Sequence, residues 1–337
     1  MSVDPAAERG IENVVRRCLR VSAGERVALL VFRLSELADD FAAAIERAGG
    51  RVSRVDLEAR VSVAPSTASP IRRALDGAAA SLLLGHETMP MSLSYTVREE
   101  AARAKTRHLH LGGVDARVLG QSARAEPDRL ALVGARVAAV LARASRLTVT
   151  SSAGTALEIA LAPTLPVVIG AGRPEAGSSE NVPAGFVYFH PGDVRGVFVA
   201  DRGLALSGQR LATRRAPVTL VFEGGRVRDR RSDDASALAQ LETFLDSHHH
   251  AGRVGTIVFP TNYLVRSEIG VYAQDELSPG INVNLGFTHQ VATRAPWDAP
   301  VQARLLARKL SVRAGETVLV TDGRHADSLV EGIDPFR

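Results

Sequence analysis

The chain up to Leu111 alternates between strand-like and helix-like apolar patterns, and this alternation limits the fold more than any other feature. Residues 27–32 form an uninterrupted apolar run, as expected for a strand that is covered on both faces. Helical patterns separate it from further strand-like runs at residues 51–57, 80–84 and 106–111. Alternation of this kind is typical of a parallel sheet. The first part of the chain is therefore predicted to be an α/β domain, a parallel sheet wrapped by helices.

The pattern changes after a predicted helix over residues 128–144. From Leu147 onward, short strand-like runs follow one another with turns between them. The clearest signal is at residues 218–229, where Glu223-Gly224-Gly225 separates two runs and predicts a β-hairpin. We therefore predict two domains, an α/β domain over residues 1–145 and an α+β domain rich in antiparallel strands over residues 146–337.

Cysteine content and apolar runs indicate a cytoplasmic protein. Cys18 is the single cysteine, so no intrachain disulfide can form, which suits a reducing compartment. The residues from Met1 to Pro5 lack the basic and then apolar pattern of a secretion signal. No apolar run approaches the roughly 20 residues that span a bilayer. We expect no membrane association.

The net charge of +4 comes almost entirely from arginine, because Lys105 and Lys309 are the only lysines. The arginines are spread along the chain and interleaved with acidic residues. Aromatic residues make up 4 % of the chain, too few for a surface that stacks bases. We therefore expect no nucleic-acid partner.

Familiar catalytic and cofactor motifs are missing from the sequence. It has no dinucleotide fingerprint, no phosphate-binding loop and no nucleophile elbow. His108 and His110 would share one face of a strand, where a satisfied pair is favoured over a metal site. His86 stands at a strand end, where sites often lie in open sheets.

Three consecutive histidines, His248, His249 and His250, follow the helical pattern that begins near Ser232. Adjacent residues on a helix point about 100° apart, so these side chains would not converge on one ion. Favourable interaction with a helix C-terminus explains them more simply.

A series of short motifs extends over nearly the whole chain. These motifs are Cys18-Leu19-Arg20-Val21, Gly24-Glu25-Arg26-Val27, Ser151-Ser152-Ala153-Gly154-Thr155-Ala156-Leu157, Asn181-Val182-Pro183-Ala184-Gly185, Gly255 with Asn262, Leu285-Gly286 and Val320-Thr321-Asp322-Gly323. In order and spacing they resemble those of the thermophilic-type metallo-aminopeptidases, the relatives of leucyl aminopeptidase T. The same fold carries the iron-dependent dihydroxypyridine dioxygenases. The resemblance implies a dimer and places the metal-site motifs in the second domain.

The residues that would bind metal in the resembled family are replaced in this chain. Phe186 stands where the family has a bridging glutamate, and Thr256 where it has a second glutamate. Asn282 replaces a histidine, and Gln302 and Arg304 replace a histidine and an aspartate. The iron ligands of the dioxygenases would fall at Asn282, Gln302 and Arg304. Phenylalanine offers no ligand atom and arginine is a permanent cation, so we expect no metal and no cofactor.

The resemblance and these replacements together predict a catalytically inactive, aminopeptidase-like protein. We expect it to bind a peptide in the former active-site cleft through Phe186, Thr256, Asn282, Gln302 and Arg304. The ligand could be a precursor peptide in the biosynthesis of a ribosomal peptide natural product, and the protein a homodimer or a heterodimer with a homologue.

Two alternatives stay open at this point. One is an active metallo-aminopeptidase whose ligands have moved, with candidates at His289, Glu316, Asp322, His325 and Asp327. His325-Ala326-Asp327 repeats the His-x-Asp pattern but follows the Asp322-Gly323 turn, which leaves few residues to complete the fold. The other alternative is a structural partner of an active homologue.

Overall fold

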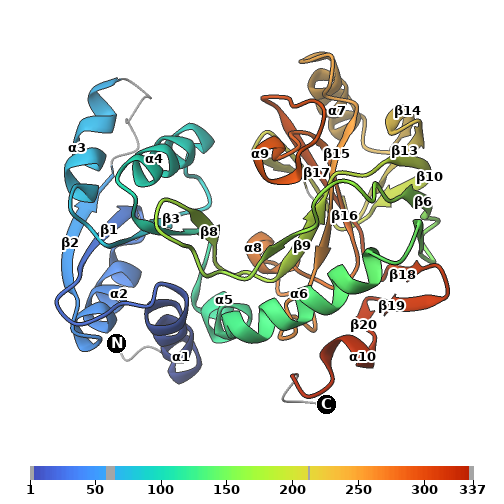
Figure 1. Cartoon of the computed structure of the whole chain (residues 1–337). Helices are drawn as coiled ribbons and strands as arrows, with labels where there is room; N and C mark the ends of the chain where they lie inside the picture. Colours follow the sequence, from blue (N-terminus) through green and yellow to red (C-terminus); the bar gives the residue numbers. More distant parts are fainter. Residues whose placement is uncertain (1–3, 58–64, 212, 334–337) are drawn as a thin grey trace. The chain divides into compact units, whose positions relative to one another are not determined.

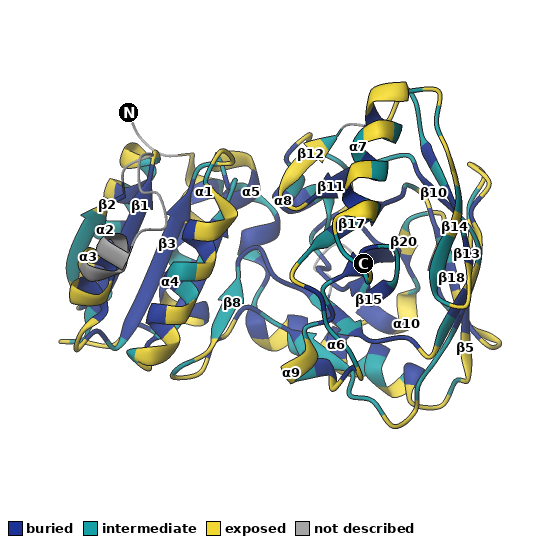
Figure 2. Cartoon of the chain, turned by 90° about the horizontal axis from the view of Figure 1, so that it is seen from above, coloured by how far each residue is buried: buried dark blue, intermediate teal, exposed yellow. Residues whose placement is uncertain are grey.

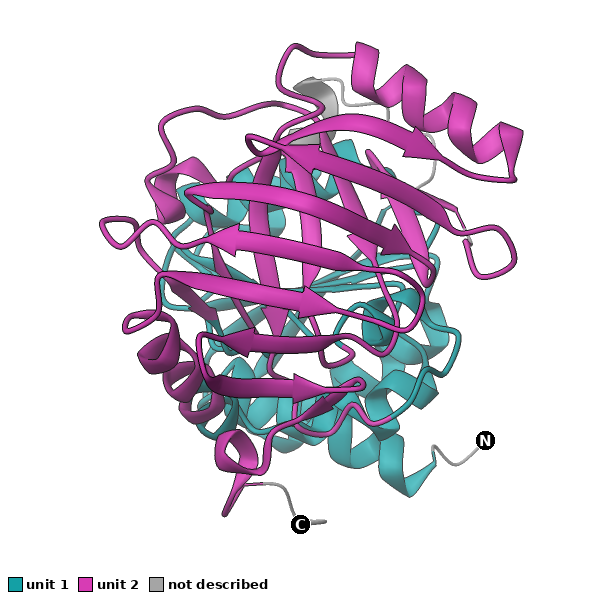
Figure 3. Ribbon diagram, turned by 90° about the vertical axis from the view of Figure 1, so that its right-hand side faces the viewer, with its two compact units in different colours: residues 1–131, 170–185, 267–277 teal, residues 132–169, 186–266, 278–337 magenta. Residues whose placement is uncertain are grey.

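The computed structural model describes residues 4–57, 65–211 and 213–333, with the side chains of residues 65–69 left out. The chain forms two compact units (Figure 3). Unit 1 contains residues 1–131, 170–185 and 267–277, and unit 2 contains residues 132–169, 186–266 and 278–337. The division therefore differs from the predicted single boundary between residues 145 and 146. The physical reason is a strand at Ser179–Asn181, which leaves the second half of the chain to join the sheet of unit 1.

Unit 1 is built on a parallel sheet, as predicted (Figure 1). The strand order is β2-β1-β3-β4-β8, and every pair is parallel. The strands are β1 (Arg26–Phe32), β2 (Arg51–Asp56), β3 (Ala80–Gly85), β4 (Arg107–Gly112) and β8 (Ser179–Asn181). The helices are α1 (Pro5–Asn13) with a π-helical turn at Val14–Cys18, α2 (Ser35–Arg47), α3 (Pro65–Leu75), α4 (Met91–Arg103), α5 (Ala116–Gly120) and α8 (Tyr272–Asp275).

Both faces of this sheet are covered, which explains the uninterrupted apolar run in β1. Leu29 and Val31 pack with Ile11 and Phe41 in one core, whereas Leu30 and Phe32 pack in a second core with helices α3 and α4. Figure 2 shows the buried strands between helices whose outer faces are exposed. The predicted wrapping by helices is confirmed.

Glu180 on β8 should make the stability of the protein depend on pH, because burial raises the pKa of its carboxyl to about 7. A backbone hydrogen bond from Gly172 and the charge of Arg98 offset part of that rise. The native state holds the proton that the unfolded chain releases near pH 4.3. The contribution of Glu180 to stability is therefore complete at low pH and is lost as pH rises through 7. We expect Glu180→Gln to leave the free energy of unfolding unchanged at pH 4 and to raise it by about 1–3 kcal/mol at pH 8. Urea unfolding measures both values, and Glu99→Gln on the exposed side of α4 is the control. Equal stability of Glu180→Gln and wild type at pH 8 would contradict the prediction.

Unit 2 contains two antiparallel sheets, in agreement with the predicted α+β class. The eight-stranded sheet has the order β14-β13-β10-β6-β5-β18-β19-β20, and its flat face is turned to the viewer in Figure 3. Its strands are β5 (Arg146–Thr150), β6 (Ala156–Ala160), β10 (Asp193–Ala200), β13 (Val218–Glu223), β14 (Arg226–Arg231), β18 (Ser311–Ala314), β19 (Thr317–Thr321) and β20 (Arg324–His325). The predicted hairpin is β13–β14, with Gly224 and Gly225 both at positive φ in its turn.

The seven-stranded sheet has the order β12-β11-β17-β16-β15-β9-β7. Its strands are β7 (Val168–Gly170), β9 (Phe186–Phe189), β11 (Gly203–Leu206), β12 (Gln209–Leu211), β15 (Val254–Pro260), β16 (Asn282–Gly286) and β17 (Gln302–Leu306). Helices α7 (Ala235–Asp246), α9 (Gln290–Thr293) and α10 (Asp327–Val330) belong to this unit, and α6 (Pro127–Leu141) runs across the division between the units. In the part of the chain that the structure describes, no helix combines the length and apolar character that a membrane span needs.

Candidate functional site

The five residues proposed to replace metal ligands all lie on strands of the seven-stranded sheet. Thr256 on β15 is the register partner of Asn284 on β16, and Asn284 is in turn the partner of Arg304 on β17. Asn282 and Gln302 lie two residues from these positions on their own strands, so their side chains project to the same side. Phe186 on β9 pairs with Pro260, which lies on that side too. The sheet register therefore gathers all five predicted residues on one face.

The opposite face of the same strands is entirely apolar. Val187, Phe259, Val283, Leu285 and Leu305 are fully buried there. A register slip of one residue would move this apolar set to the polar face, so burial of the apolar face fixes the register. The alternation of buried apolar and polar residues thus determines which side chains form the candidate site.

Amide and hydroxyl groups dominate the middle of the polar face. Thr256 is fully buried, and Asn282 and Asn284 are 6 % and 4 % exposed. The side-chain nitrogen Nδ2 of Asn284 donates a hydrogen bond to Thr256 Oγ1 over 3.1 Å. Within residues 4–57, 65–211 and 213–333, the other amide atom of Asn284, Oδ1, is buried without a hydrogen-bond partner. An unpaired buried acceptor costs about 1–3 kcal/mol, so this oxygen is a candidate contact for a ligand.

Arg304 and Gln302 form the cationic end of the polar face. Both side chains are half-buried, and Arg304 Nε donates to Gln302 Oε1 over 3.3 Å. The forked donors of a guanidinium bind a carboxylate, and its permanent positive charge repels a metal ion.

Aromatic rings cover the other end of the polar face. The rings of Phe186 and Tyr188 are 6.0 Å apart, and those of Tyr188 and His289 are 5.1 Å apart. Phe287 continues the series at 4.5 Å from His289. Phe186 was predicted as a site residue and Tyr188 was not, although the period of two along β9 places both on one face.

His190 and Trp297 form a neighbouring cluster that the sequence analysis also missed. His190 Nδ1 lies 2.7 Å from the carbonyl oxygen of Gly255 and donates to it, which leaves Nε2 as the acceptor of the neutral ring. Burial lowers the pKa of His190, the hydrogen bond to Gly255 raises it and Arg253 lowers it further. The guanidinium of Arg253 lies 4.4 Å from the ring centroid of Trp297, a cation–π contact. No spacing in the sequence links these residues, which explains why they were missed.

Gly255 positions the whole site, because the β15–β16 register shifts between Val254 and Thr256. A Cβ at Gly255 would lie 2.5 Å from the carbonyl oxygen of Gly286 and 2.6 Å from that of Phe287, and both are backbone atoms. We expect Gly255→Ala to lower the free energy of unfolding by about 2–4 kcal/mol, because the strands must separate to admit the methyl group. Chemical denaturation measures this loss. The control is Gly252→Ala, whose nearest contact is an ordinary 3.5 Å to Leu245, and equal losses in the two variants would contradict the prediction.

The residues proposed as relocated metal ligands do not gather around one point. His325 Nε2 lies 2.8 Å from the carbonyl oxygen of Pro260, and Asp327 begins α10. Glu316 faces Arg313 at 3.5 Å, and His289 belongs to the aromatic series. In the described ranges, no three His, Cys, Asp or Glu side chains are grouped so that they could hold a metal ion.

His86 directly follows β3 and His108 and His110 lie two residues apart on β4, as predicted. His108 is fully buried with Nδ1 2.9 Å from Ser81 Oγ, and His86 Nδ1 lies 2.9 Å from Thr88 Oγ1. Helix α7 ends at Asp246, so the prediction that His248, His249 and His250 end a helix is wrong. They lie in the following turn, with ring centroids 3.9–5.7 Å apart.

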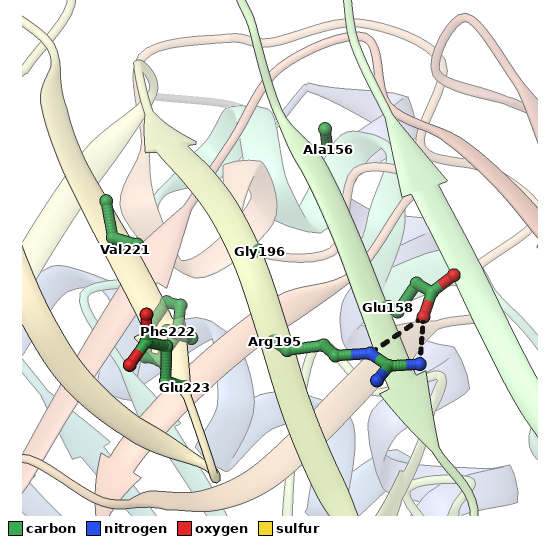
Figure 4. Close-up of a pocket in the computed structure, with 7 residues that line it drawn as sticks. All are labelled: Ala156, Glu158, Arg195, Gly196, Val221, Phe222 and Glu223. Carbon is green, nitrogen blue, oxygen red and sulfur yellow. Dashed lines mark hydrogen bonds and ion pairs between the residues drawn. The ribbon is translucent and has the colours of Figure 1, made fainter.

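A hollow of about 340 Å³ lies on the eight-stranded sheet (Figure 4). Ala156, Gly196 and Val221 are among the residues that line it, as are Arg195 and Glu158, which pair at 2.7 Å. Arg195 pairs with one of its two carboxylates, Glu158, and the hollow lies on a different sheet from the predicted residues. We therefore place the candidate site on the polar face of the seven-stranded sheet.

Comparison with known proteins gives the family. A family model described as NicX, 2,5-dihydroxypyridine 5,6-dioxygenase, matches residues 9–251. The chain belongs to the NicX family. The match ends before Thr256, Asn282, Gln302 and Arg304, so it does not include four of the five positions discussed above. No curated protein matches the sequence.

Two solved structures share the fold over almost their whole length. The 2,5-dihydroxypyridine dioxygenase from Pseudomonas putida KT2440 is 17 % identical with a TM-score of 0.67, and the match covers 96 % of this chain and 98 % of that one. AmpT from Thermus thermophilus is 18 % identical with a TM-score of 0.67, covering 95 % and 99 %. These likenesses confirm the predicted fold class.

The metal that this fold family implies does not fit the residues of the polar face. A divalent ion needs negative or strongly donating groups, and the ligand atoms available at Asn282, Gln302 and Thr256 are neutral amide and hydroxyl oxygens. Arg304 adds a positive charge beside them, and Phe186 contributes none of the atoms that bind metal. We therefore derive no chemical step through a metal for this chain.

Proposed function

We propose that this chain is a non-catalytic binding protein that holds a peptide on the polar face of the seven-stranded sheet. The observation that carries the proposal is that Phe186, Thr256, Asn282, Gln302 and Arg304 share one ordered face but include none of the acidic or histidine side chains that a metallohydrolase needs. The scaffold is aminopeptidase-like, while the chemistry of its former centre has changed.

The groups on this face suit a peptide. Amides and hydroxyls pair with peptide N–H and C=O groups, and the Asn284 oxygen still offers an acceptor. The rings of Phe186 and Tyr188 can pack against an apolar side chain, which contributes about 1.5–3 kcal/mol when fully buried. As part of this proposal, the ligand is a precursor peptide of a ribosomal natural product and the protein acts as a dimer.

The family match favours a second candidate, a dioxygenase acting on a dihydroxypyridine. It is supported by the NicX match over residues 9–251. The replacement of the iron-ligand positions by Asn282, Gln302 and Arg304 weighs against it, because none of the three can supply an anionic ligand. An aminopeptidase with relocated ligands is the third candidate. Against it, no three His, Cys, Asp or Glu side chains of the described residues are grouped so that they could hold a metal ion.

Three measurements on the purified full chain separate these candidates. Incubation with zinc, cobalt or iron and subsequent dialysis should leave no stoichiometric metal. In the presence of each added metal, the protein should neither hydrolyse leucine amide nor consume 2,5-dihydroxypyridine with oxygen. Calorimetric titration with a mixed peptide library should give saturable binding, which Asn282→Leu weakens while Thr148→Val on the other sheet does not. Turnover of either small substrate, or absence of peptide binding, would reject the proposal.

A further inference from the structure

We propose that the polar face recognises the C-terminal residue of its peptide, with Asn284 accepting the last N–H and Arg304 binding the free carboxylate. The inference rests on the proposed function and names the end of the peptide that the site selects. Two observations carry it, the unpaired amide oxygen of Asn284 and the position of Arg304 beside it.

The amide oxygen of Asn284 is available to a donor from a ligand. Its Nδ2 group already donates to Thr256 Oγ1, and the side chain is 4 % exposed. Its Oδ1 atom finds no hydrogen-bond partner among the residues that the structure describes. Since an amide oxygen accepts and does not donate, a group carrying an N–H satisfies it.

Arg304 supplies the second contact from the adjacent strand. Asn284 and Arg304 are register partners on β16 and β17, and side chains at such positions start about 4.5–5.5 Å apart on the same face. Arg304 Nε also donates to Gln302 Oε1, which lies two residues away on the same strand. A guanidinium in a partly buried position binds a carboxylate through two parallel, charge-assisted hydrogen bonds.

A peptide C-terminus fits this spacing better than the other ends or side chains of a peptide. In the last residue a single Cα separates the amide nitrogen from the carboxylate carbon, which places them about 2.5 Å apart. One residue can therefore reach both Asn284 and Arg304. An N-terminal ammonium would be repelled by Arg304, and an acidic side chain holds its carboxylate farther from the N–H of its own residue.

The test compares a library of random hexapeptides that have free C-termini with the same library after C-terminal amidation. The full-length protein should bind the free acids about 10–100-fold more tightly, the range for hydrogen bonds to a charged group. Arg304→Gln should lower the affinity for free acids to that for amides and leave the amides unchanged. Asn284→Leu should weaken both libraries equally, because both retain the last N–H.

Arg313→Gln, at an exposed arginine of β18, is the matched control and should change neither affinity. Thermal unfolding shows whether each variant is folded. If Arg304→Gln does not fold, the affinities of wild type for free acids and for amides still test the inference. Equal affinity of wild type for acids and amides overturns this inference but leaves the proposed function intact. Absence of binding to both libraries rejects the two together.

Discussion

We expect at least one divalent metal ion per chain to bind to a variant with five substitutions, hereafter the five-fold variant. The substitutions are Phe186→Glu, Thr256→Glu, Asn282→His, Gln302→His and Arg304→Asp. These substitutions return the residue types of the resembled metallo-aminopeptidases to one face of the seven-stranded sheet. They add three carboxylates and two imidazoles and remove the guanidinium, so the local charge falls by four. We expect the variant to bind zinc or cobalt with micromolar or tighter affinity, about 8 kcal/mol of binding free energy, and we expect no such binding by wild type. Metal content after dialysis and calorimetric titration measure the gain.

A variant with three of the five substitutions tests whether metal binding needs the full set of ligands or only the added negative charge. Phe186→Glu, Thr256→Glu and Arg304→Asp together bring the same three carboxylates without the histidines, and should bind the metal far more weakly. Failure of the five-fold variant to bind, while it remains folded, would show that this face no longer has the geometry of a metal centre. Stoichiometric binding by wild type would show that other residues of the chain hold the ion.

Features of the fold could be predicted from the sequence where they depend on neighbouring residues, and not where they depend on distant parts of the chain. The uninterrupted apolar run of β1 and the double-glycine turn of the β13–β14 hairpin depend on neighbouring residues, so both were predicted correctly. Strand β8 has three residues and no apolar pattern, and it is defined only by pairing with β4 from a distant part of the chain. Because β8 pairs with β4, unit 1 includes residues beyond the predicted boundary between residues 145 and 146.

The candidate site shows the same limit. The five substituted positions came from the order of motifs, and the register of β9, β15, β16 and β17 then placed them on one face. Asn284 was not predicted, because the lack of a described hydrogen-bond partner for its oxygen depends on the Thr256 contact and on burial. The cluster of His190, Arg253 and Trp297 depends on loop packing, which no local pattern encodes.

Acidification is expected to destabilise unit 1 through His108. Burial is the main reason that its pKa falls to about 3, and the charge of Arg98 lowers it further. Burial also lowers the pKa of His110 well below its usual value, with further contributions from Arg98 and His108. The native state keeps both rings neutral, whereas the unfolded chain protonates them near pH 6.5. Stability is therefore complete above pH 6.5 and lost as pH falls, by about 2–3 kcal/mol for His108 alone at pH 4.5.

Over part of this pH range, acidification raises the free energy of unfolding through Glu180, which opposes the effect of the histidines. The contribution of Glu180 must therefore be removed first. In the Glu180→Gln background, urea unfolding between pH 7.5 and 4.5 should show the full loss due to the two histidines. Adding His108→Gln keeps a polar partner for Ser81 but removes the titrating ring. We expect it to lower stability at pH 7.5 and to reduce the acid-induced loss by about 2–3 kcal/mol. His249→Gln in the exposed turn is the control. An unchanged acid-induced loss in the His108 variant would mean that the ring takes up a proton without unfolding, through an opening of the sheet that water can reach.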